Sequence, residues 1–398
     1  MQYDNNCQNI NVWAPEHAEK LPVMVWLHGG GFSIGSAYAS RDYNGENLAG
    51  TQNVVVVSVN HRLNVLGHLD LSEYGEEYRH SANVGIDDIV KALEWIQKNI
   101  AVFGGDPNNI TLFGQSGGGA KILALMDFPY VKGLFHKGII QSGATETVGV
   151  SFTSSEAGKA VAANMLSSLG ISKDNISAIE NVSYRDLMSA GDRALSAVAN
   201  EYRIPGPFGG YSMEWEPVVD GDYIPTNPVT EDSFAENGKD IPILIGSNLM
   251  EWTRFIASEQ LQVTNEVQAA FNAAYPNESP NDARYADTLI RLPMLKIMSH
   301  KADQRGAKVY SYLYTYGTSA HGAELPYVFA NGNGKMNGVM SSIWANFART
   351  GVPSADGVPE WEAYTRENGA CMILDEESYL AYHHDAALLS LVKPNYRY

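Results

Sequence analysis

The sequence predicts an α/β fold in which a mostly parallel sheet is covered by helices. Seven short runs are apolar and rich in β-branched or aromatic residues, a composition typical of strands. The middle runs are apolar almost throughout, which indicates burial on both faces of the sheet. A helix with one apolar stripe lies between two of these runs, as a crossover between parallel strands requires. The predicted strands are Asn9 to Trp13, Val23 to Leu27, Val54 to Val59, Ile110 to Phe113, Lys137 to Gln141, Ile241 to Ile245 and Val309 to Tyr314.

The crossover helix is predicted by apolar residues that recur in steps of three and four from Ile86 to Ile100. Asp87 and Asp88 stand near its start, where negative charge interacts favourably with the helix dipole. Similar patterns predict four further helices. These are Glu156 to Leu169, Tyr184 to Asn200, Asn265 to Tyr275 and Met336 to Arg349.

The length and composition favour one large domain. A chain of 398 residues that is 44% hydrophobic can bury an extensive core. No linker composition interrupts it, so we expect a single domain over 1–398. Helical insertions are expected at roughly 148–215 and 252–306, between predicted strands.

The charge balance argues against some partners. The chain has 45 acidic and 27 basic residues, a net charge of −18, which disfavours nucleic acid and anionic membranes. No stretch is long and apolar enough for a membrane span or a secretory leader. Two cysteines cannot form a disulfide framework. We therefore expect a cytoplasmic protein, with secretion after loss of a leader as the alternative, and leave the oligomeric state open.

Ser116 stands in the most informative stretch, Ile110 to Met126. This stretch reads as a buried strand, a very tight turn at Gly114-Gln-Ser116-Gly-Gly118, and a helix. A serine at such a corner has a strained backbone that exposes its hydroxyl, and glycines allow the chain to pass close to itself. The segment Gly31-Phe-Ser33-Ile-Gly35 has the same pattern, but polar, loop-like residues follow it. Context therefore selects Ser116 as a nucleophile.

Three consecutive glycines follow another predicted strand, in His28-Gly-Gly-Gly31-Phe32. Successive glycines let backbone N–H groups gather around one ligand atom, as an oxyanion hole requires. A flexible loop is the alternative interpretation of this motif taken by itself. Its place after a buried strand, in a chain that also has the Ser116 turn, favours the functional interpretation.

The general base for a serine nucleophile at neutral pH is expected to be one of ten histidines. His321 is the best placed, because it follows the strand Val309 to Tyr314 on a loop, where α/β sheets build their active sites. The orienting acid is expected after another strand, where Glu251 stands. Asp220 and Asp222 remain rivals, although an Asp-Gly pair fits a turn better. The resulting order of serine, acid and histidine is that of α/β-hydrolases.

The chain resembles the type-B carboxylesterases of the carboxylesterase and cholinesterase family, nearly from end to end. This resemblance implies an α/β-hydrolase fold, with Ser116 as nucleophile, Glu251 as acid and His321 as base. It is carried by the segments Asp4 to Trp13, His28 to Phe32, Asn60 to Gly67, Phe103 to Pro107, Phe113 to Gly119, Gln141 to Gly143, Pro217 to Gly221 and His321 to Glu324.

The resemblance also implies supporting residues. The backbone N–H groups of Gly30, Gly31 and Gly117 match the family's oxyanion hole. Ser142 matches a second serine that supports the triad, and Gln115 stands beside the nucleophile where the family usually has glutamate.

The chain departs from the family at its beginning. It starts after the family's N-terminal segment, which carries edge strands, a wall of the gorge and the partner of the cysteine matching Cys7. Cys7 is therefore expected to be unpaired. A choline ester is not expected as the preferred substrate, because the aromatic cation site of cholinesterases lies in that segment.

These observations predict a serine hydrolase of small to medium carboxylic esters that needs no metal or cofactor. Phe32, Phe208 and Trp252 are candidate walls of the substrate pocket, with ordinary core packing as the alternative for each. A lipase or amidase of the same fold is the main alternative function, since a triad alone does not distinguish these substrates. A non-catalytic adhesion relative is a further alternative, but every triad position is filled here.

Overall fold

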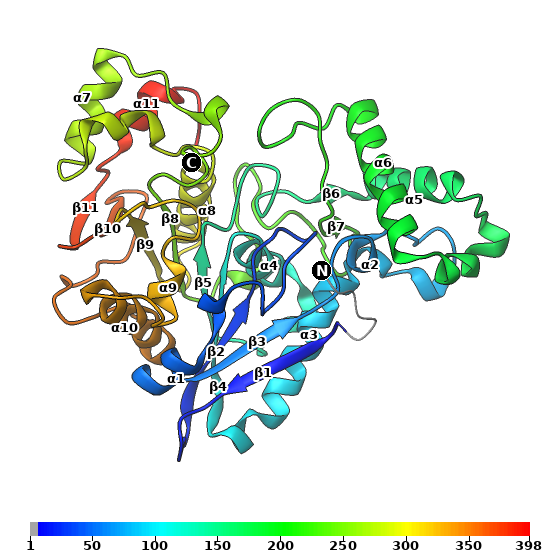
Figure 1. Cartoon of the computed structure of the whole chain (residues 1–398), viewed down its shortest axis with the longest axis horizontal. Helices are drawn as coiled ribbons and strands as arrows, with labels where there is room; N and C mark the ends of the chain where they lie inside the picture. The colour runs from blue at the N-terminus through cyan, green and yellow to red at the C-terminus, as the bar shows by residue number, and fades with distance from the viewer. Residues whose placement is uncertain (1–6) are drawn as a thin grey trace.

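The computed structural model describes residues 7–398, so the first residues of the Asp4 to Trp13 motif, 4–6, lie outside it. Its centre is a nine-stranded sheet in the order β1-β3-β2-β4-β5-β8-β9-β10-β11 (Figure 1). The strands are β1 (Asn9–Trp13), β2 (Leu21–Leu27), β3 (Val55–Asn60), β4 (Gly105–Gln115), β5 (Lys137–Gln141), β8 (Ile243–Asn248), β9 (Val309–Tyr314), β10 (Ala370–Leu374) and β11 (Tyr379–Tyr382).

The sheet is parallel except at its two edges. β1 pairs antiparallel with β3, and β11 pairs antiparallel with β10, while every pair between them is parallel. A separate pair of short parallel strands, β6 (Thr153–Ser154) and β7 (Val218–Val219), lies outside this sheet. The near-continuous apolar runs are buried on both faces, as the sequence predicts.

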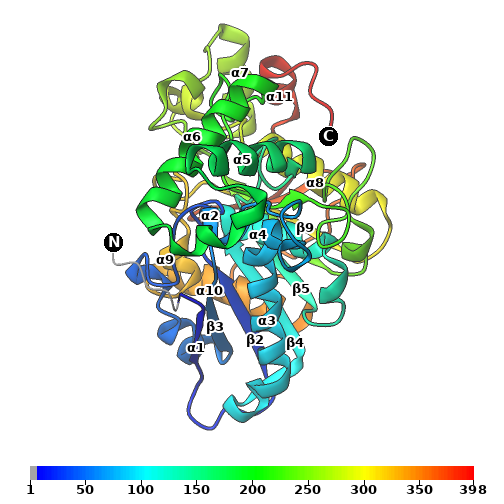
Figure 2. The same ribbon diagram turned by 90° about the vertical axis from the view of Figure 1, so that its right-hand side faces the viewer.

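Helices cover both faces of the sheet (Figures 1 and 2). One face packs against α3 (Val84–Asn99), α4 (Gly117–Asp127) and α8 (Arg291–Asp303), in a core that includes Ile89, Leu123 and Ile297. The other packs against α1 (Glu46–Gln52), α9 (Leu325–Val328) and α10 (Lys335–Thr350), around Trp26 and Trp344. The predicted α/β fold with a mostly parallel sheet is therefore confirmed.

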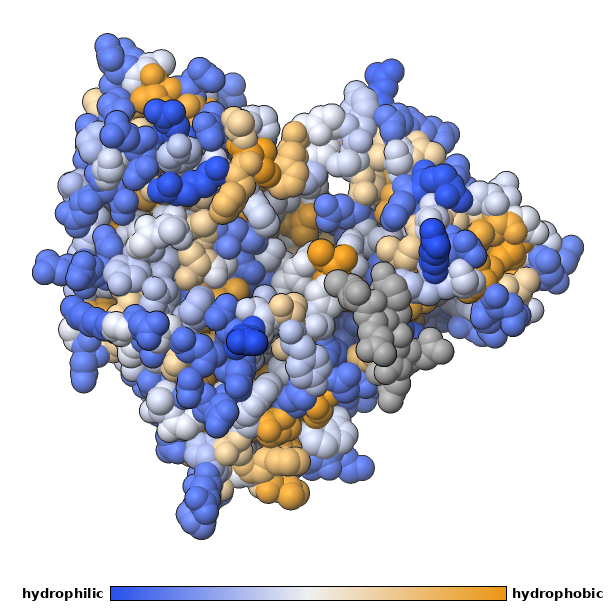
Figure 3. Space-filling model, in the orientation of Figure 1, coloured by the Kyte–Doolittle hydropathy of each residue, from blue (hydrophilic) through white to orange (hydrophobic). Residues whose placement is uncertain are grey.

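Two helical lobes stand beside the sheet (Figure 1). In one, α5 (Ser155–Ser168) and α6 (Tyr184–Tyr202) enclose their own apolar core together with α2 (Asn64–His68). In the other, α7 (Asn265–Ala274) and α11 (Ala386–Val392) pack with the end of the sheet. The space-filling view shows a hollow between the two lobes (Figure 3), and α4 lies between them in Figure 1.

The two ranges in which helical insertions are expected contain different kinds of helix. The range 148–215 contains α5 and α6, which share one apolar cluster. The range 252–306 contains α7 but also α8, and α8 is a sheet-covering helix packed on β8 and β9 rather than part of a lobe. Two strands, β10 and β11, extend the sheet beyond those predicted. Among residues 7–398, none of the helices has the length and apolarity that a membrane crossing demands.

The carboxyl ends of the parallel strands are joined by one further hydrogen bond each. The N–H of Ser116, just after β4, donates to the carbonyl of Gln141 at 2.8 Å, and the N–H of Ser142 donates to that of Gly246 at 2.8 Å. The pattern continues across the sheet. The N–H of Leu249 donates to the carbonyl of Tyr314 at 2.9 Å, and the N–H of Thr315 donates to that of Leu374 at 3.0 Å. We call these four bonds the strand-end ladder.

Candidate active site

Ser116 occupies the corner between β4 and α4. Its backbone is in a strained region, with φ 56° and ψ −129°. A Cβ on Gly118 would lie 1.9 Å from the carbonyl oxygen of Leu27, and a Cβ on Gly114 would lie 2.5 Å from the Gly118 backbone. Only glycine fits at these two positions, so the local sequence Gly-x-Ser-x-Gly builds this corner. Ser33, in the rival match, lies in a loop and precedes no helix.

The glycine loop after β2 lies against the start of α4. Gly30 and Gly31 have positive φ angles of 92° and 59°, which favour glycine. A Cβ on Gly117 would stand 2.3 Å from the Gly31 carbonyl oxygen, so the two backbones are in direct contact. Within residues 7–398, the backbone N–H groups of Gly30, Gly31 and Gly117 donate no hydrogen bond. Three donors are therefore available near the Ser116 corner.

The structure brings His321 and Glu251 together. Nδ1 of His321 lies 2.6 Å from Oε2 of Glu251, whose side chain is fully buried. The other oxygen of Glu251 accepts from the hydroxyl of Ser142 at 2.6 Å and from the N–H of Asn248 at 2.7 Å. The Trp252 ring stacks on the imidazole at 4.2 Å between centroids. The position of the His321 ring and that of the Glu251 carboxylate are thus both fixed by packing and hydrogen bonds.

The second ring nitrogen of His321 contacts Gln115. The Nε2 atoms of the two side chains lie 3.0 Å apart, so the Gln115 amide donates to the imidazole while Nδ1 donates to Glu251. Ser116 makes no hydrogen bond to His321 in the part of the chain that the structure describes. Gln115, which precedes Ser116 in the sequence, therefore contacts His321 directly.

A buried polar network that the sequence analysis did not assign supports these residues. Asn248 donates to the carbonyl of Ala320, next to His321, at 2.6 Å and to Glu324 at 2.7 Å. Gln141 donates to Glu324 at 2.9 Å and accepts from Trp344 at 3.0 Å. Burial raises the pKa of Glu324, and the Asn248 hydrogen bond opposes this. The sequence contained a signal for this network, because Gln141 and Glu324 stand in two of the segments that carry the family resemblance.

The remaining candidates have different surroundings. Phe32 is 1% exposed and packs edge-on against His68 and Phe152, which argues against a wall of an open pocket and favours core packing. Phe208 is 45% exposed on its loop, and Trp252 lies against His321.

Asp220 and Asp222, the alternative candidates for the orienting acid, make their hydrogen bonds and ion pairs with other residues. Asp220 accepts from Asn83 and from N–H groups of its own turn. Asp222 pairs with Arg79 and accepts from Tyr130. Neither carboxylate contacts His321, so the turn interpretation describes them better.

The parallel sheet, the serine corner and the histidine and acid on later strand-end loops define the chain as an α/β-hydrolase. The sequence model of the Carboxylesterase family matches residues 1–285 and 277–388. The chain belongs to this family and is a carboxylic ester hydrolase.

Individual relatives agree with this assignment. The para-nitrobenzyl esterase of Bacillus subtilis (strain 168) is 33% identical over 409 residues, which cover 94% of this chain and 79% of that protein. A solved esterase from the anaerobe Clostridium hathewayi, described as able to hydrolyze aliphatic aromatic polyesters, is 34% identical with a TM-score of 0.86. It is matched over 98% of this chain and 83% of its own. The human bile salt-activated lipase is 27% identical over 92% of this chain and 56% of that protein.

Proposed function

We propose that the chain hydrolyses carboxylic esters in two steps through an acyl-enzyme on Ser116, with His321 as general base and Glu251 as its orienting acid. The contact between His321 Nδ1 and Glu251 Oε2, at 2.6 Å with the carboxylate fully buried, is the observation that carries the proposal. It keeps the proton on Nδ1 and leaves Nε2 as the acceptor that a serine nucleophile needs.

In the first step, Nε2 of His321 takes the proton of Ser116 as its Oγ attacks the ester carbonyl carbon. The carbonyl oxygen becomes an oxyanion, which the N–H groups of Gly30, Gly31 and Gly117 stabilise. As the tetrahedral intermediate collapses, the bond to the alkoxy oxygen breaks and His321 returns the proton to the leaving alcohol. The acyl group stays on Ser116.

In the second step, His321 takes a proton from water, and the resulting hydroxide attacks the acyl-enzyme carbonyl. The carboxylic acid leaves, and the proton returns to Ser116. Both steps need Nε2 to accept a proton, so the Gln115 amide must give up its hydrogen bond to His321 in each cycle. One neutral hydrogen bond costs about 0.5–1.5 kcal/mol to break, which does not prevent turnover.

A fluorophosphonate probe tests the nucleophile, because only an activated hydroxyl attacks it. We expect stoichiometric labelling that mass mapping assigns to Ser116. Ser33 provides the matched control, since it has the same flanking pattern without the strand and helix. Labelling of Ser33, or no labelling of the folded protein, would contradict the proposal.

We propose small to medium esters as substrates, with Trp252, which stacks on His321, and the exposed Phe208 as candidate pocket walls. A lipase is the second candidate, and the similarity to a bile salt-activated lipase favours considering it. Hydrolysis rates for a series of aryl esters of increasing acyl length distinguish the two. A maximum at short acyl chains supports an esterase, and a maximum at long chains in emulsion supports a lipase.

A further inference from the structure

Lys121 is a buried cation in the second turn of α4. Its side chain is fully buried, and its ammonium donates to the carbonyl oxygens of His28 at 2.9 Å and Gly31 at 2.8 Å. It also lies 5.5 Å from the centre of the Phe32 ring. Among the described residues no carboxylate pairs with it. Its partners are therefore all in the glycine loop after β2.

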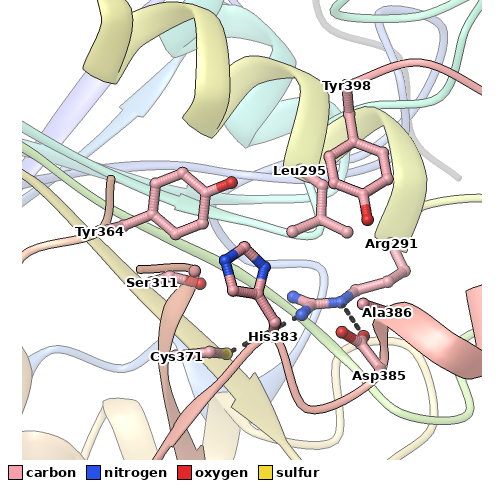
Figure 4. Close-up of a pocket in the computed structure, with 10 residues that line it drawn as sticks. Arg291, Leu295, Ser311, Tyr364, Cys371, His383, Asp385, Ala386 and Tyr398 are labelled. Carbon is pink, nitrogen blue, oxygen red and sulfur yellow. Dashed lines mark hydrogen bonds and ion pairs between the residues drawn. The ribbon is translucent and has the colours of Figure 1, made fainter. Parts of the chain in front are cut away.

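Buried charges are normally neutralised by an opposite charge, because desolvation without a partner is costly. Arg291 follows this rule: its guanidinium donates to Asp385 at 2.7 Å, beside Cys371 (Figure 4). Lys121 does not follow it, and burial lowers its pKa to about 7. Within residues 7–398, the two carbonyl oxygens and the face of the Phe32 ring are the compensation that the fold provides for this charge.

The two carbonyls flank the oxyanion loop. The carbonyl of His28 belongs to the peptide unit before Gly29, and that of Gly31 belongs to the unit before Phe32. A hydrogen bond from Lys121 to each oxygen fixes these two peptide planes. The two units between them are held by other groups, since the Gly29 carbonyl lies 2.8 Å from Nδ1 of His28 and the Gly30 carbonyl accepts from the N–H of Ile34 at 3.0 Å. The N–H groups of Gly30 and Gly31 lie between these fixed units. Donors aimed in advance at a developing charge are what an oxyanion hole requires.

We propose that Lys121 is a positioning residue of the oxyanion hole, which holds the His28 and Gly31 peptide units so that the loop N–H groups face the developing oxyanion. When the side chain is protonated, its charge, which has no carboxylate partner among the described residues, complements the negative charge of the tetrahedral intermediate. This inference rests on the proposed function of Ser116 and the loop, and it adds a residue that makes no contact with the ester.

Lys121→Met tests the inference, because methionine keeps much of the length and the apolar stem but removes the charge and both hydrogen bonds. We expect kcat for an aryl ester to fall by about 10²- to 10³-fold, with KM within about threefold.

Lys301→Met is the matched control. Lys301 is equally buried, donates to the carbonyl of Lys239 at 2.7 Å and lies 5.8 Å from the Phe234 ring. Both variants should lose thermal stability, but Lys301→Met should keep kcat within about twofold.

A trifluoromethyl ketone separates positioning from general destabilisation. Ser116 adds to its carbonyl carbon and leaves an oxyanion, whereas the corresponding alcohol binds without forming one. Lys121→Met should weaken the ketone by about the same factor as kcat and leave the affinity of the alcohol unchanged. Equal weakening of both compounds, or an unchanged kcat, would overturn the inference.

Two further measurements keep the test decisive. Should Lys121→Met fail to fold, Lys121→Gln keeps a neutral donor, and a tenfold or larger loss of kcat at unchanged KM supports the inference, while a smaller loss overturns it. Ser116→Ala is assayed alongside. Activity retained by Ser116→Ala would overturn the proposed function itself, whereas retention by the Lys121 variants alone overturns only the role of Lys121.

Discussion

The two ring nitrogens of His321 contact regions that are built in different ways. On the Nδ1 side, Glu251 is fully buried and is held by Ser142 and by the N–H of Asn248. On the Nε2 side, the contact is one neutral amide from Gln115, next to the Ser116 corner. The first side has several charge-assisted hydrogen bonds in a dry environment, and the second has a single bond that can be exchanged. The orientation of the His321 ring is therefore fixed through Nδ1, while Nε2, the atom that accepts a proton in the proposed mechanism, has only one exchangeable hydrogen bond.

The largest effect is expected from removing the proposed nucleophile, Ser116, on the Nε2 side of His321. Ser116→Ala should lower ester turnover by about 10⁴- to 10⁶-fold, because only binding and the oxyanion hole then remain. Steady-state kcat on an aryl ester measures this, with Ser33→Ala as the matched control. Equal losses in the two variants would remove the distinction between the two Gly-x-Ser-x-Gly segments.

The next largest effect is expected on the Nδ1 side. Glu251→Gln keeps the size of the side chain but removes the charge that stabilises the protonated imidazole, so kcat should fall by about 10³- to 10⁴-fold with little change in KM. Asp220→Asn is the control and should stay near the wild-type rate. The reverse result would move the orienting acid to Asp220.

A smaller effect is expected when the support of Glu251 is weakened. Ser142→Ala removes one hydrogen bond to the carboxylate, and bonds to charged groups contribute about 1.5–3 kcal/mol. We therefore expect kcat to fall by about 10- to 100-fold. A normal kcat in this variant would mean that the N–H of Asn248 is sufficient to hold Glu251.

The smallest effect on catalysis is expected from a substitution of Gln115. A substitution of its neighbour Gln141 should instead affect stability, so the two variants are compared. The two glutamines end adjacent strands in register. Gln115→Leu removes one neutral bond to His321 and should change kcat/KM by no more than about tenfold. Gln141→Leu leaves the Trp344 N–H and one carboxylate oxygen of the buried Glu324 without a partner, so it should lower the free energy of unfolding by about 2 kcal/mol or more. Denaturant unfolding and kinetics of both variants measure this.

Much of the fold was predictable because the strands have simple signals. Lys137 to Gln141 and Val309 to Tyr314 were predicted with the bounds of β5 and β9, since both are short, apolar and bounded by polar residues. β10 was missed because Ala370, Cys371 and Met372 are not β-branched. α8 was missed because it is buried on nearly all sides, so it has no polar stripe to mark a helical period.

Some residues of the site were likewise predictable from the sequence, and others were not. The Ser116 corner was predictable because its requirements are local: two glycines, a strand before and a helix after. His321 and Glu251 were predictable only from their order and their places after strands, since they are 70 residues apart. The positioning role proposed for Lys121 was not predictable from the sequence. Lys121 is the one charged residue between Gly117 and Met126 of α4. The sequence pattern of this helix does not show which distant carbonyl oxygens accept hydrogen bonds from its ammonium group.

The strand-end ladder has a consequence for where the molecule can open. Amide hydrogens in buried sheet hydrogen bonds exchange with solvent only through large-scale unfolding, whereas those of exposed loops exchange through local opening. The amides of Ser116 and Ser142 both belong to the ladder. Their exchange should therefore be as slow as that of the central strands. The proposed nucleophile Ser116 then stands on a part of the backbone that opens only with the whole sheet, and we expect any local motion that admits an ester to occur in the loops and lobes around it.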